Sequence, residues 1–471
     1  MTIFGTLVHL IYLACATCFV LGLHLMNTPS TARWGNRLSA TGMTVAIATT
    51  VAVLAVDRLI SWPAVAVLAA GTAAGSIAGV LTARRVAMTA MPQLVSLFNA
   101  VGGGAAAIIA IGDAVEHAGG LDRLPVATTL TTVLDLVLGG ITFSGSLVAA
   151  GKLAGIVPGR PIVLRGGRGV TVALTLVTIV LAGFFLAGHA GLVALAAIVG
   201  IALVAGVLIT LPIGGADMPV VISLLNACTG TAVAMAGFVL DSTPLIIGGA
   251  LVGAAGAILT KLMADAMNRP VIAILAGGFG TGDEQVSGPA GGSGSVREIT
   301  ADDAALQLAY AGKVVIVPGY GLAAAQAQHE VVALAQALTE HGVEVSYGIH
   351  PVAGRMPGHM NVLLAEANAP YPELRDLEQI NPEFPRTDVV LVVGANDVTN
   401  PAARRPGNPV SGMPILDVDK AKSVIVIKRS LGHGYAGIDN ELYTEPHTAM
   451  LFADAKAGIT ALTAGLRVYA V

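Results

Sequence analysis

Gly319, Gly321 and Ala324 follow a short apolar run, residues 313–317, with the spacing G-x-G-x-x-A. Glycines at this spacing permit a tight turn and let a phosphate group come close to the backbone, and the N-terminus of a following helix favours an anion. The pattern therefore indicates a dinucleotide site at Gly319, Tyr320 and Gly321. A tight turn without a ligand is the alternative.

Two cations and a hydroxyl, Lys428, Arg429 and Ser430, follow directly on another apolar run, residues 423–427. They suit the 2′-phosphate of NADP, which forms charge-assisted hydrogen bonds with such groups. An NAD site usually has an acidic residue at the end of its second strand, whereas the second apolar run here ends at His350. The sequence therefore favours NADP over NAD, and a solvated basic turn is the alternative.

Three further loops carry groups that suit a bound nucleotide. Arg355, in the loop of residues 350–359, is placed to bind a pyrophosphate, and Asp397 follows directly on an apolar run. Residues 431–435 have the composition of a flexible cover, with Tyr435 as its apolar cap. The His and Met residues of the first loop lack the spacing of metal ligands, so no metal site is predicted.

These loops need strands and helices to position them. Short apolar runs alternate with helical stretches, the first of which extends to about residue 341, and this alternation predicts a doubly wound parallel sheet, an α/β Rossmann-like domain. Ligands of such sheets bind beyond the carboxyl ends of the strands. The predicted strands are residues 313–317, 343–349, 388–393, 414–417 and 423–427.

The rest of the chain has the composition of a membrane protein. The 471 residues are 55% hydrophobic and 11% charged, against about 25% charged in soluble proteins. Residues 1–270 hold 12 Lys and Arg against 8 Asp and Glu, and residues 271–471 hold 13 against 21. The sequence therefore predicts a membrane domain at 1–270, a linker at 271–300 whose residues 281–295 form a flexible coil, and a soluble domain at 301–471.

About nine stretches reach the roughly 20 apolar residues that a bilayer-spanning helix requires. Alternate breaks between them hold ten Lys and Arg on one side and two on the other. Positive loops stay in the cytoplasm, so the soluble domain is predicted to be cytoplasmic and the N-terminus outside. The predicted spans of this polytopic α-helical bundle are residues 3–25, 37–56, 62–81, 92–111, 127–150, 170–188, 191–212, 219–240 and 244–264.

Polar residues inside apolar spans are candidates for a transport path because they are costly to bury in a membrane. The alternative for each is an interhelical hydrogen bond, and Asp135 could also lie near a membrane interface. The six candidates are Asn99, Asp135, Ser144, Ser146, Asp217 and Asn226.

Small residues recur in two spans at the spacing that lets helix backbones approach closely. They are Gly71, Gly75 and Gly79 in one span and Gly249, Gly253 and Gly256 in another. Close contacts between helices are therefore expected at both places.

Several longer motifs resemble the β subunit of proton-translocating NAD(P) transhydrogenases, over nearly the full chain. They are PGYGLAAAQAQ at 318–328, HPVAGRMPG at 350–358, GAND at 394–397, KRSLGHGY at 428–435, MPQLV at 91–95 and GGADMPVV at 214–221. The resemblance implies a proton-translocating membrane domain and a soluble domain that binds NADP(H), with the nucleotide lying reversed on its sheet. It also implies a bacterial inner-membrane location.

The resemblance further implies partners. One or two α subunits would supply the NAD(H) site and the remaining helices, lipid would surround the bundle, and the assembled complex would be a dimer; no nucleic acid is expected. Asp217 and Asn226 match positions implicated in proton passage or coupling, whereas Asn99 stands where some family members have His, so a partner helix would have to supply that ionisable group.

The resemblance carries an NADP site onto matching positions of this chain. Because hydride passes directly between two cofactors, no general acid or base is required, and no catalytic side chain is predicted. The implied binding residues are Tyr320, Val352, Ala353, Gly354, Arg355, Met356, Pro357, Gly394, Ala395, Asn396, Asp397, Val398, Gly412, Met413, Lys428, Arg429, Ser430, Leu431, Gly432, His433, Gly434, Tyr435, Asp454 and Ala455.

Hydride exchange between two nucleotides needs two sites, and this chain offers one Rossmann-like unit, so it should be inactive alone. An ion channel or transporter with a regulatory nucleotide-binding domain is the other function that fits both halves of the architecture. In that case the nucleotide would change ion flux without being chemically altered.

Overall fold

The computed structural model describes most of the chain. The predicted coil at 281–295 lies outside the described residues. Those described are residues 3–26, 29–56, 61–86, 90–116, 126–159, 161–162, 166–186, 192–214, 217–267, 270–275, 296–354, 358–408, 410–434 and 436–469.

Within these residues, nine helices are long and apolar enough to cross a membrane, which confirms the nine predicted spans. Helices suit this environment because every backbone polar group inside them is hydrogen-bonded within its own segment. Their bounds are α1 Ile3–Leu25, α2 Pro29–Val56, α3 Trp62–Arg85, α4 Met91–Glu116, α5 Val126–Leu153, α6 Gly167–Leu186, α7 Leu192–Thr210, α8 Met218–Val239 and α9 Thr243–Ala266.

Small residues set the closest contacts in the bundle. A Cβ atom on Gly230 of α8 would collide with the backbone of Gly253 on α9, and one on Gly249 would collide with that of Ala234. The predicted close contact of α9 is therefore confirmed. Along α4 and α5, Gly103 and Gly139 meet in the same way.

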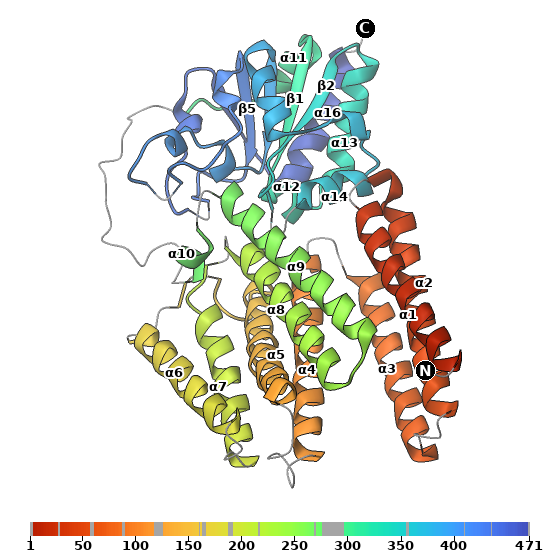
Figure 1. Ribbon diagram of the computed structural model, residues 1–471. Coiled ribbons are helices and arrows are strands. Elements are labelled where there is room, and N and C mark those ends of the chain that lie inside the picture. Colours follow the sequence, from red (N-terminus) through yellow and green to blue (C-terminus); the bar gives the residue numbers. More distant parts are fainter. Residues whose placement is uncertain are drawn as a thin grey trace.

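Helix α3 differs from this pattern. A Cβ atom on Gly71, Gly75 or Gly79 would meet no atom within 4 Å, and α3 has no buried residue. The expected helix contact on this glycine face is therefore not made within the described part of the chain. Figure 1 shows α3 beside α1 and α2, at one side of the other membrane helices.

The soluble domain contains a six-stranded parallel sheet of order β3-β2-β1-β4-β5-β6. This is the strand order of dinucleotide-binding folds, with the switch point between β1 and β4. The strands are β1 Lys313–Pro318, β2 Glu344–Ile349, β3 Leu374–Asp376, β4 Val389–Val393, β5 Ser423–Lys428 and β6 Thr448–Phe452.

The sheet separates two hydrophobic layers. In β1, Val314 and Ile316 face one layer and Val315 and Val317 the other, as the alternation of side chains in a strand requires. The first layer contains helices α11 Ala301–Ala309, α13 Gln328–Glu340, α14 His359–Glu366 and α16 Ala455–Tyr469. The second contains the short α15 Leu377–Ile380 and irregular segments around Phe384, Leu416 and Tyr443. Both layers are built only from residues after 295, so the domain has a core of its own.

Three details differ from the expected elements. Residues 414–417 are not a strand, because their backbone bonds to loops instead of a ladder: Asn381 Nδ2 donates to Ile415 O at 3.0 Å and Leu416 N donates to Val398 O at 2.9 Å. Strands β3 and β6 were not predicted. The helix expected after β1 is broken into α12 Tyr320–Ala324 and α13 at Gln326, which has a left-handed φ of 51°.

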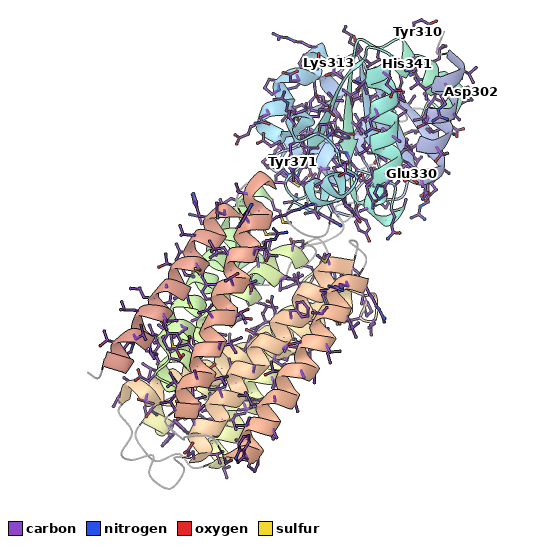
Figure 2. The ribbon with its side chains drawn as sticks, turned by 90° about the vertical axis from the view of Figure 1, so that its right-hand side faces the viewer. Asp302, Tyr310, Lys313, Glu330, His341 and Tyr371 are labelled. Atoms are coloured by element: carbon purple, nitrogen blue, oxygen red, sulfur yellow. The ribbon has the colours of Figure 1, made fainter. Side chains whose placement is uncertain are left out.

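The soluble domain lies at one end of the membrane helices (Figure 1). Figure 2 shows Lys313, at the start of β1, and His341, just before β2, on the side of the domain away from the helices. The carboxyl ends of the strands therefore point toward the bundle. The short helix α10 Val271–Leu275 packs on that bundle through Ile274, which is buried with Met218 and Val221.

Candidate nucleotide site and polar residues of the bundle

The glycines of the fingerprint bring two strand ends together. A Cβ atom on Gly319 would collide with the backbone of Ala395, and Gly394 has a left-handed φ of 66°. Gly319 N donates to Val393 O and Gly321 N donates to Gly394 O, each at 2.9 Å. These amides are thus already bonded within the protein.

The expected role of this turn as a phosphate cradle therefore needs correction. Helix α12 has only five residues, so it offers a much smaller dipole than the long helix that usually follows the fingerprint. Together with the bonded amides, this leaves the glycines with a packing role: they let the turns after β1 and β4 touch.

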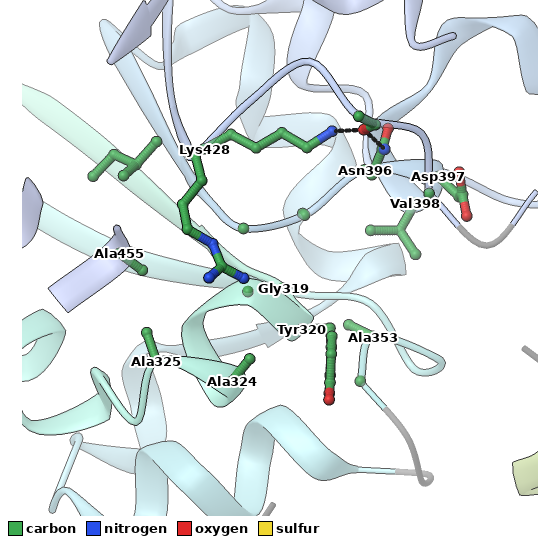
Figure 3. A pocket seen from close by; sticks show the side chains of 18 of the residues that line it. Gly319, Tyr320, Ala324, Ala325, Ala353, Asn396, Asp397, Val398, Lys428 and Ala455 are labelled. Atoms are coloured by element: carbon green, nitrogen blue, oxygen red, sulfur yellow. Dashed lines mark hydrogen bonds between the residues drawn. The ribbon is translucent and has the colours of Figure 1, made fainter. Parts of the chain in front are cut away.

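A cavity of about 490 Å³ lies beyond the carboxyl ends of five strands. Figure 3 shows Tyr320, Ala353, Asp397, Lys428 and Ala455 around it. Its lining residues are Gly319, Tyr320, Gly321, Ala324, Ala325, Val352, Ala353, Gly354, Gly394, Ala395, Asn396, Asp397, Val398, Ile427, Lys428, Arg429, Ser430, Gly432, His433, Gly434, Ala453, Asp454 and Ala455.

The structure brings together most of the predicted binding residues. Three do not line the cavity: Gly412 N donates to Ala403 O at 2.7 Å, Met413 packs against a small separate cluster, and Leu431 is exposed. Four lie outside the described residues: Arg355, Met356, Pro357 and Tyr435. Four lining residues were not among the predicted contacts, although Ala324 and Ala325 lie within the motif at 318–328 and Ile427 and Ala453 directly precede predicted residues.

Lys428 is the half-buried cation of the site. Its Nζ donates to Gly432 O and lies 4.9 Å from the centroid of the Tyr443 ring. Burial lowers the pKa of Lys428 below its ordinary value, and the negative charge of Asp397 offsets part of this effect. Arg429, the next residue, is exposed and lines the cavity.

The loop that was expected to cover the site is fastened at its base. Asp397 Oδ2 accepts a hydrogen bond from Ala436 N at 3.0 Å. The side-chain oxygen of Asn396, beside Lys428 in Figure 3, accepts from Gly434 N at 2.7 Å and from Lys428 Nζ at 3.0 Å. A Cβ atom on Gly434 would collide with the Asp397 carboxylate. A larger residue at Gly434 would therefore displace the Asp397 carboxylate that fastens the loop.

His350 supports the opposite wall of the cavity. Its Nδ1 accepts from Val352 N at 3.2 Å, so its Nε2–H donates to Pro414 O at 2.7 Å. Burial lowers the pKa of His350 to about 4, and the ring is therefore neutral at pH 7. It ties the loop of Val352 and Ala353 to the segment after Met413.

Asn99 and Asn226 lie along the contact between α4 and α8. Asn99 Nδ2 donates to Ile222 O at 3.3 Å, and a Cβ atom on Gly102 would lie 3.0 Å from the Thr229 side chain. Ile222, Asn226 and Thr229 occupy one helix face at spacings i, i+4 and i+7. This spacing places Asn226 on the face of α8 that contacts α4.

The three candidates of α5 differ in the hydrogen bonds that they make. Ser96 Oγ of α4 donates to Ser146 O at 2.8 Å, whereas Ser144 Oγ donates to a carbonyl of its own helix and packs against Gly206 of α7. Asp135 is fully buried.

Asp217 directly precedes α8 and is fully buried. Lys152, at the same end of the bundle, is one of the ten cations counted in the breaks between the predicted spans, but it is only 5% exposed. Its Nζ donates to Leu211 O at 2.5 Å and to Ile213 O at 2.7 Å. The ammonium group thus bonds to two backbone carbonyls just after the end of α7, of which Leu211 O also accepts from Ile162 N at 3.1 Å.

Comparison with known proteins decides the family. The sequence model of the family described as NAD(P) transhydrogenase beta subunit matches residues 8–465. The NAD(P) transhydrogenase subunit beta of Rhodospirillum rubrum is 46% identical over 451 residues, which cover 94% of this chain and 96% of the relative. The same figures hold for the protein of strain ATCC 11170 of that organism. The chain belongs to the NAD(P) transhydrogenase beta subunit family.

Membership in this family confirms the predicted resemblance and favours a transhydrogenase over a nucleotide-regulated channel. Transhydrogenases are oxidoreductases that use nicotinamide nucleotides. With its long apolar helices, the chain is therefore an integral membrane protein of such an enzyme, and its α/β domain is the part with a Rossmann-like fold.

Proposed function

We propose that the cavity of the soluble domain binds NADP(H). The observation that supports this most is the pair of cations, Lys428 and Arg429, followed by the Ser430 hydroxyl, at the carboxyl end of β5. These groups fit the 2′-phosphate by charge and hydrogen bonding. Beyond the end of β2 the cavity wall carries Val352, with the neutral His350 behind it, instead of an acidic residue for a free ribose hydroxyl.

The cofactor, when bound, supplies the hydride chemistry. The residues of this chain bind and orient it: the cations hold the phosphate, the close turns at Gly319 and Gly394 shape the floor, and the loop fastened by Asp397 limits the access of water. The residues outside the described part, Arg355, Met356, Pro357 and Tyr435, and the three outside the cavity lining, Gly412, Met413 and Leu431, stay proposed contacts.

An α subunit would bind NAD(H) and exchange hydride with this site, because the described residues form a single Rossmann-like sheet. The same partner would supply further membrane helices. The exposed glycine face of α3 supports this part of the proposal, since small residues at that spacing suit a second helix. Dimerisation of the assembled complex and a surrounding layer of lipid complete the proposed assembly.

The bundle is proposed to translocate protons and thereby to change the affinity of the soluble domain for NADP(H). Asn99, Asp135, Ser144, Ser146, Asp217 and Asn226 are the candidate residues for passage or coupling. The excess of Lys and Arg in alternate loops supports a cytoplasmic soluble domain and an outside N-terminus, in a bacterial inner membrane.

Replacing Arg429 with Ala tests the nucleotide site. A charge-assisted hydrogen bond to phosphate contributes about 1.5–3 kcal/mol, so NADPH should bind roughly 10 to 100 times more weakly. The much weaker binding of NADH should not change, since NADH lacks the 2′-phosphate. Calorimetry on the complex gives both affinities, with Arg467→Ala, on the exposed side of α16, as the matched control. Equal NADPH affinity in wild type and Arg429→Ala would refute the site.

Coupling is tested in sealed vesicles that contain this chain and its α partner. Formation of NADPH from NADH should accelerate when a proton gradient is imposed and should slow when an uncoupler collapses it. A rate that ignores the gradient would contradict proton translocation, whatever the affinity measurements show.

A further inference from the structure

The contact between α4 and α5 has a definite antiparallel register. Gln93 Nε2 donates to Leu153 O at 3.0 Å and Ser96 Oγ donates to Ser146 O at 2.8 Å. Farther along, a Cβ atom on Gly103 would lie 2.9 Å from Thr142.

Near the other end of the two helices, Thr132 Oγ1 donates to Asp113 Oδ2 at 3.4 Å. As the residue number rises on α4 it falls equally on α5, so Asp135 lies opposite Ala110. Both of these residues are fully buried.

This contact contains polar atoms that the protein leaves without hydrogen bonds. Both carboxyl oxygens of Asp135, Thr142 Oγ1 and Ser146 Oγ are buried and have no partner among the described residues. Buried polar groups in native proteins are nearly always hydrogen-bonded, to protein or to ordered water. Asp135, Thr142 and Ser146 follow one another on one face of α5 at spacings of seven and four residues. The unbonded polar atoms therefore form a continuous line along the helix.

Among the described residues of the helices around α5, no charged group is available to pair with Asp135. Helix α4 carries Asp113 and Glu116, toward its C-terminal end, and Asp113 is engaged with Thr132. Helix α7 contains no ionisable residue, and α8 contains only Cys228. The one charged residue of α6, Arg168, lies in its first turn, whereas Phe185 near its other end packs with Leu136, next to Asp135.

A carboxylate without a counter-charge in such surroundings is strongly disfavoured, and the group is held neutral by a bound proton instead. We propose that Asp135 is the residue of this chain that takes up and releases the translocated proton. Water bridges it to Thr142 and Ser146, which lie about 10 Å and 16 Å away along the helix at 1.5 Å per residue. Only an O–H bond forms and breaks: the carboxylate takes a proton from water on one side and gives it to water on the other. This inference rests on the proposed proton translocation.

The test uses the complex with its α partner in sealed vesicles and the variants Asp135→Asn and Asp135→Glu. Asp241→Asn is the matched control, because Asp241 is exposed after α8 and its φ of 49° suits Asn. The first measurement is NADPH formation from NADH under a proton gradient. The second is hydride exchange from NADH to an NAD analogue through NADP(H) that stays bound, which needs no proton-coupled release of nucleotide.

Asp135→Asn should lower the gradient-driven rate of NADPH formation at least tenfold and leave the rate of hydride exchange within twofold of wild type. Asp135→Glu should keep part of the gradient-driven rate, and the control Asp241→Asn should keep all of it. An undiminished coupled rate in Asp135→Asn would overturn the assignment. An equal loss of both rates would also overturn it, because the residue would then serve folding or assembly. If the rate of NADPH formation by the wild-type complex did not respond to the gradient, the proposed proton translocation itself would be refuted, and with it the role of Asp135.

Infrared spectroscopy gives a readout that a structural role would not move. The wild-type complex should show the carbonyl band of a protonated carboxyl group, which shifts in Asp135→Glu and disappears in Asp135→Asn. A band that persists unchanged in the variants would contradict the proposal. Because Asp135→Glu alone suffices for this comparison, the test holds even where Asp135→Asn does not assemble.

Discussion

Protonation of His350 should destabilise the nucleotide-binding domain as the pH falls. The folded domain holds the ring neutral by burial, which lowers its pKa from 6.5 to about 4. At pH values between 4 and 6.5, the His350 side chain is therefore protonated in the unfolded chain, which has the ordinary pKa, and neutral in the folded domain. Stability is therefore full above pH 6.5, falls between pH 6.5 and 4, and changes little from this group below pH 4.

The magnitude follows from the shift. Each pH unit between the two pKa values changes the unfolding free energy by about 1.4 kcal/mol. Between pH 7 and pH 4.5, His350 should therefore remove about 2.5 kcal/mol. This is a large fraction of the roughly 5–15 kcal/mol that stabilises a typical domain.

The assay is urea unfolding of residues 296–471, whose core is complete within that segment, at several pH values from 7 to 4.5. His350→Gln retains a donor for Pro414 O but does not titrate, so its difference from wild type should shrink by about 2.5 kcal/mol over this range. His341→Asn, an exposed histidine after α13, is the control and should follow the wild type. Parallel curves for wild type and His350→Gln would refute the reasoning, because carboxylates contribute equally to both.

Three further substitutions test the packing. Gly319→Ala should cost the soluble domain about 1–3 kcal/mol because its Cβ would collide with Ala395, whereas Gly348→Ala, with no neighbour closer than 3.4 Å, should be tolerated in the same thermal unfolding experiment. Gly249→Ala should lower the melting temperature of the complex in detergent because it forces α8 and α9 apart, and Gly248→Ala, where a Cβ would meet open space, should not. Lys152→Met should cost about 1–3 kcal/mol because it leaves the buried Ile213 O without a donor, whereas Leu211 O keeps its bond from Ile162 N. The exposed Lys261→Met should cost much less, and equal melting temperatures for the two would contradict the buried role of Lys152.

The sheet was predictable from sequence where its strands are buried on both faces. Residues 313–317, 388–393 and 423–427 are continuous apolar runs bounded by glycine or charged residues, and each is a central strand. Residues 414–417 have a similar composition but lie beside loops, and β3 has only three residues, so a local pattern could not separate them. Strand formation there depends on which backbone comes alongside, and this is a property of the whole domain.

The nucleotide site was predictable in membership but not in the role of each part. Motifs at strand ends identified Tyr320, Asp397 and Lys428 because parallel strands place their carboxyl ends at one edge. The fingerprint suggested a phosphate cradle, yet the amides of Gly319 and Gly321 bond to the turn after β4. A spacing of glycines shows that backbone must come close to something; it does not show whether that is a phosphate or a second turn.

The polar residues of the bundle show a related limit. Hydropathy identifies Asn99, Asp135 and Asn226 as polar groups in apolar helices, but the rotation of each helix is set by its neighbours. In the structure α4 contacts α8 at Asn99, and it contacts α5 in the region opposite Asp135. Helix α4 is therefore shared by the two contacts. Coupling between two sites requires an element whose arrangement both of them bias, and α4 meets the geometric part of that requirement. A displacement of α4 would change the surroundings of Asn226 and Asp135 together, whereas a displacement of α9 would reach only the α8 side.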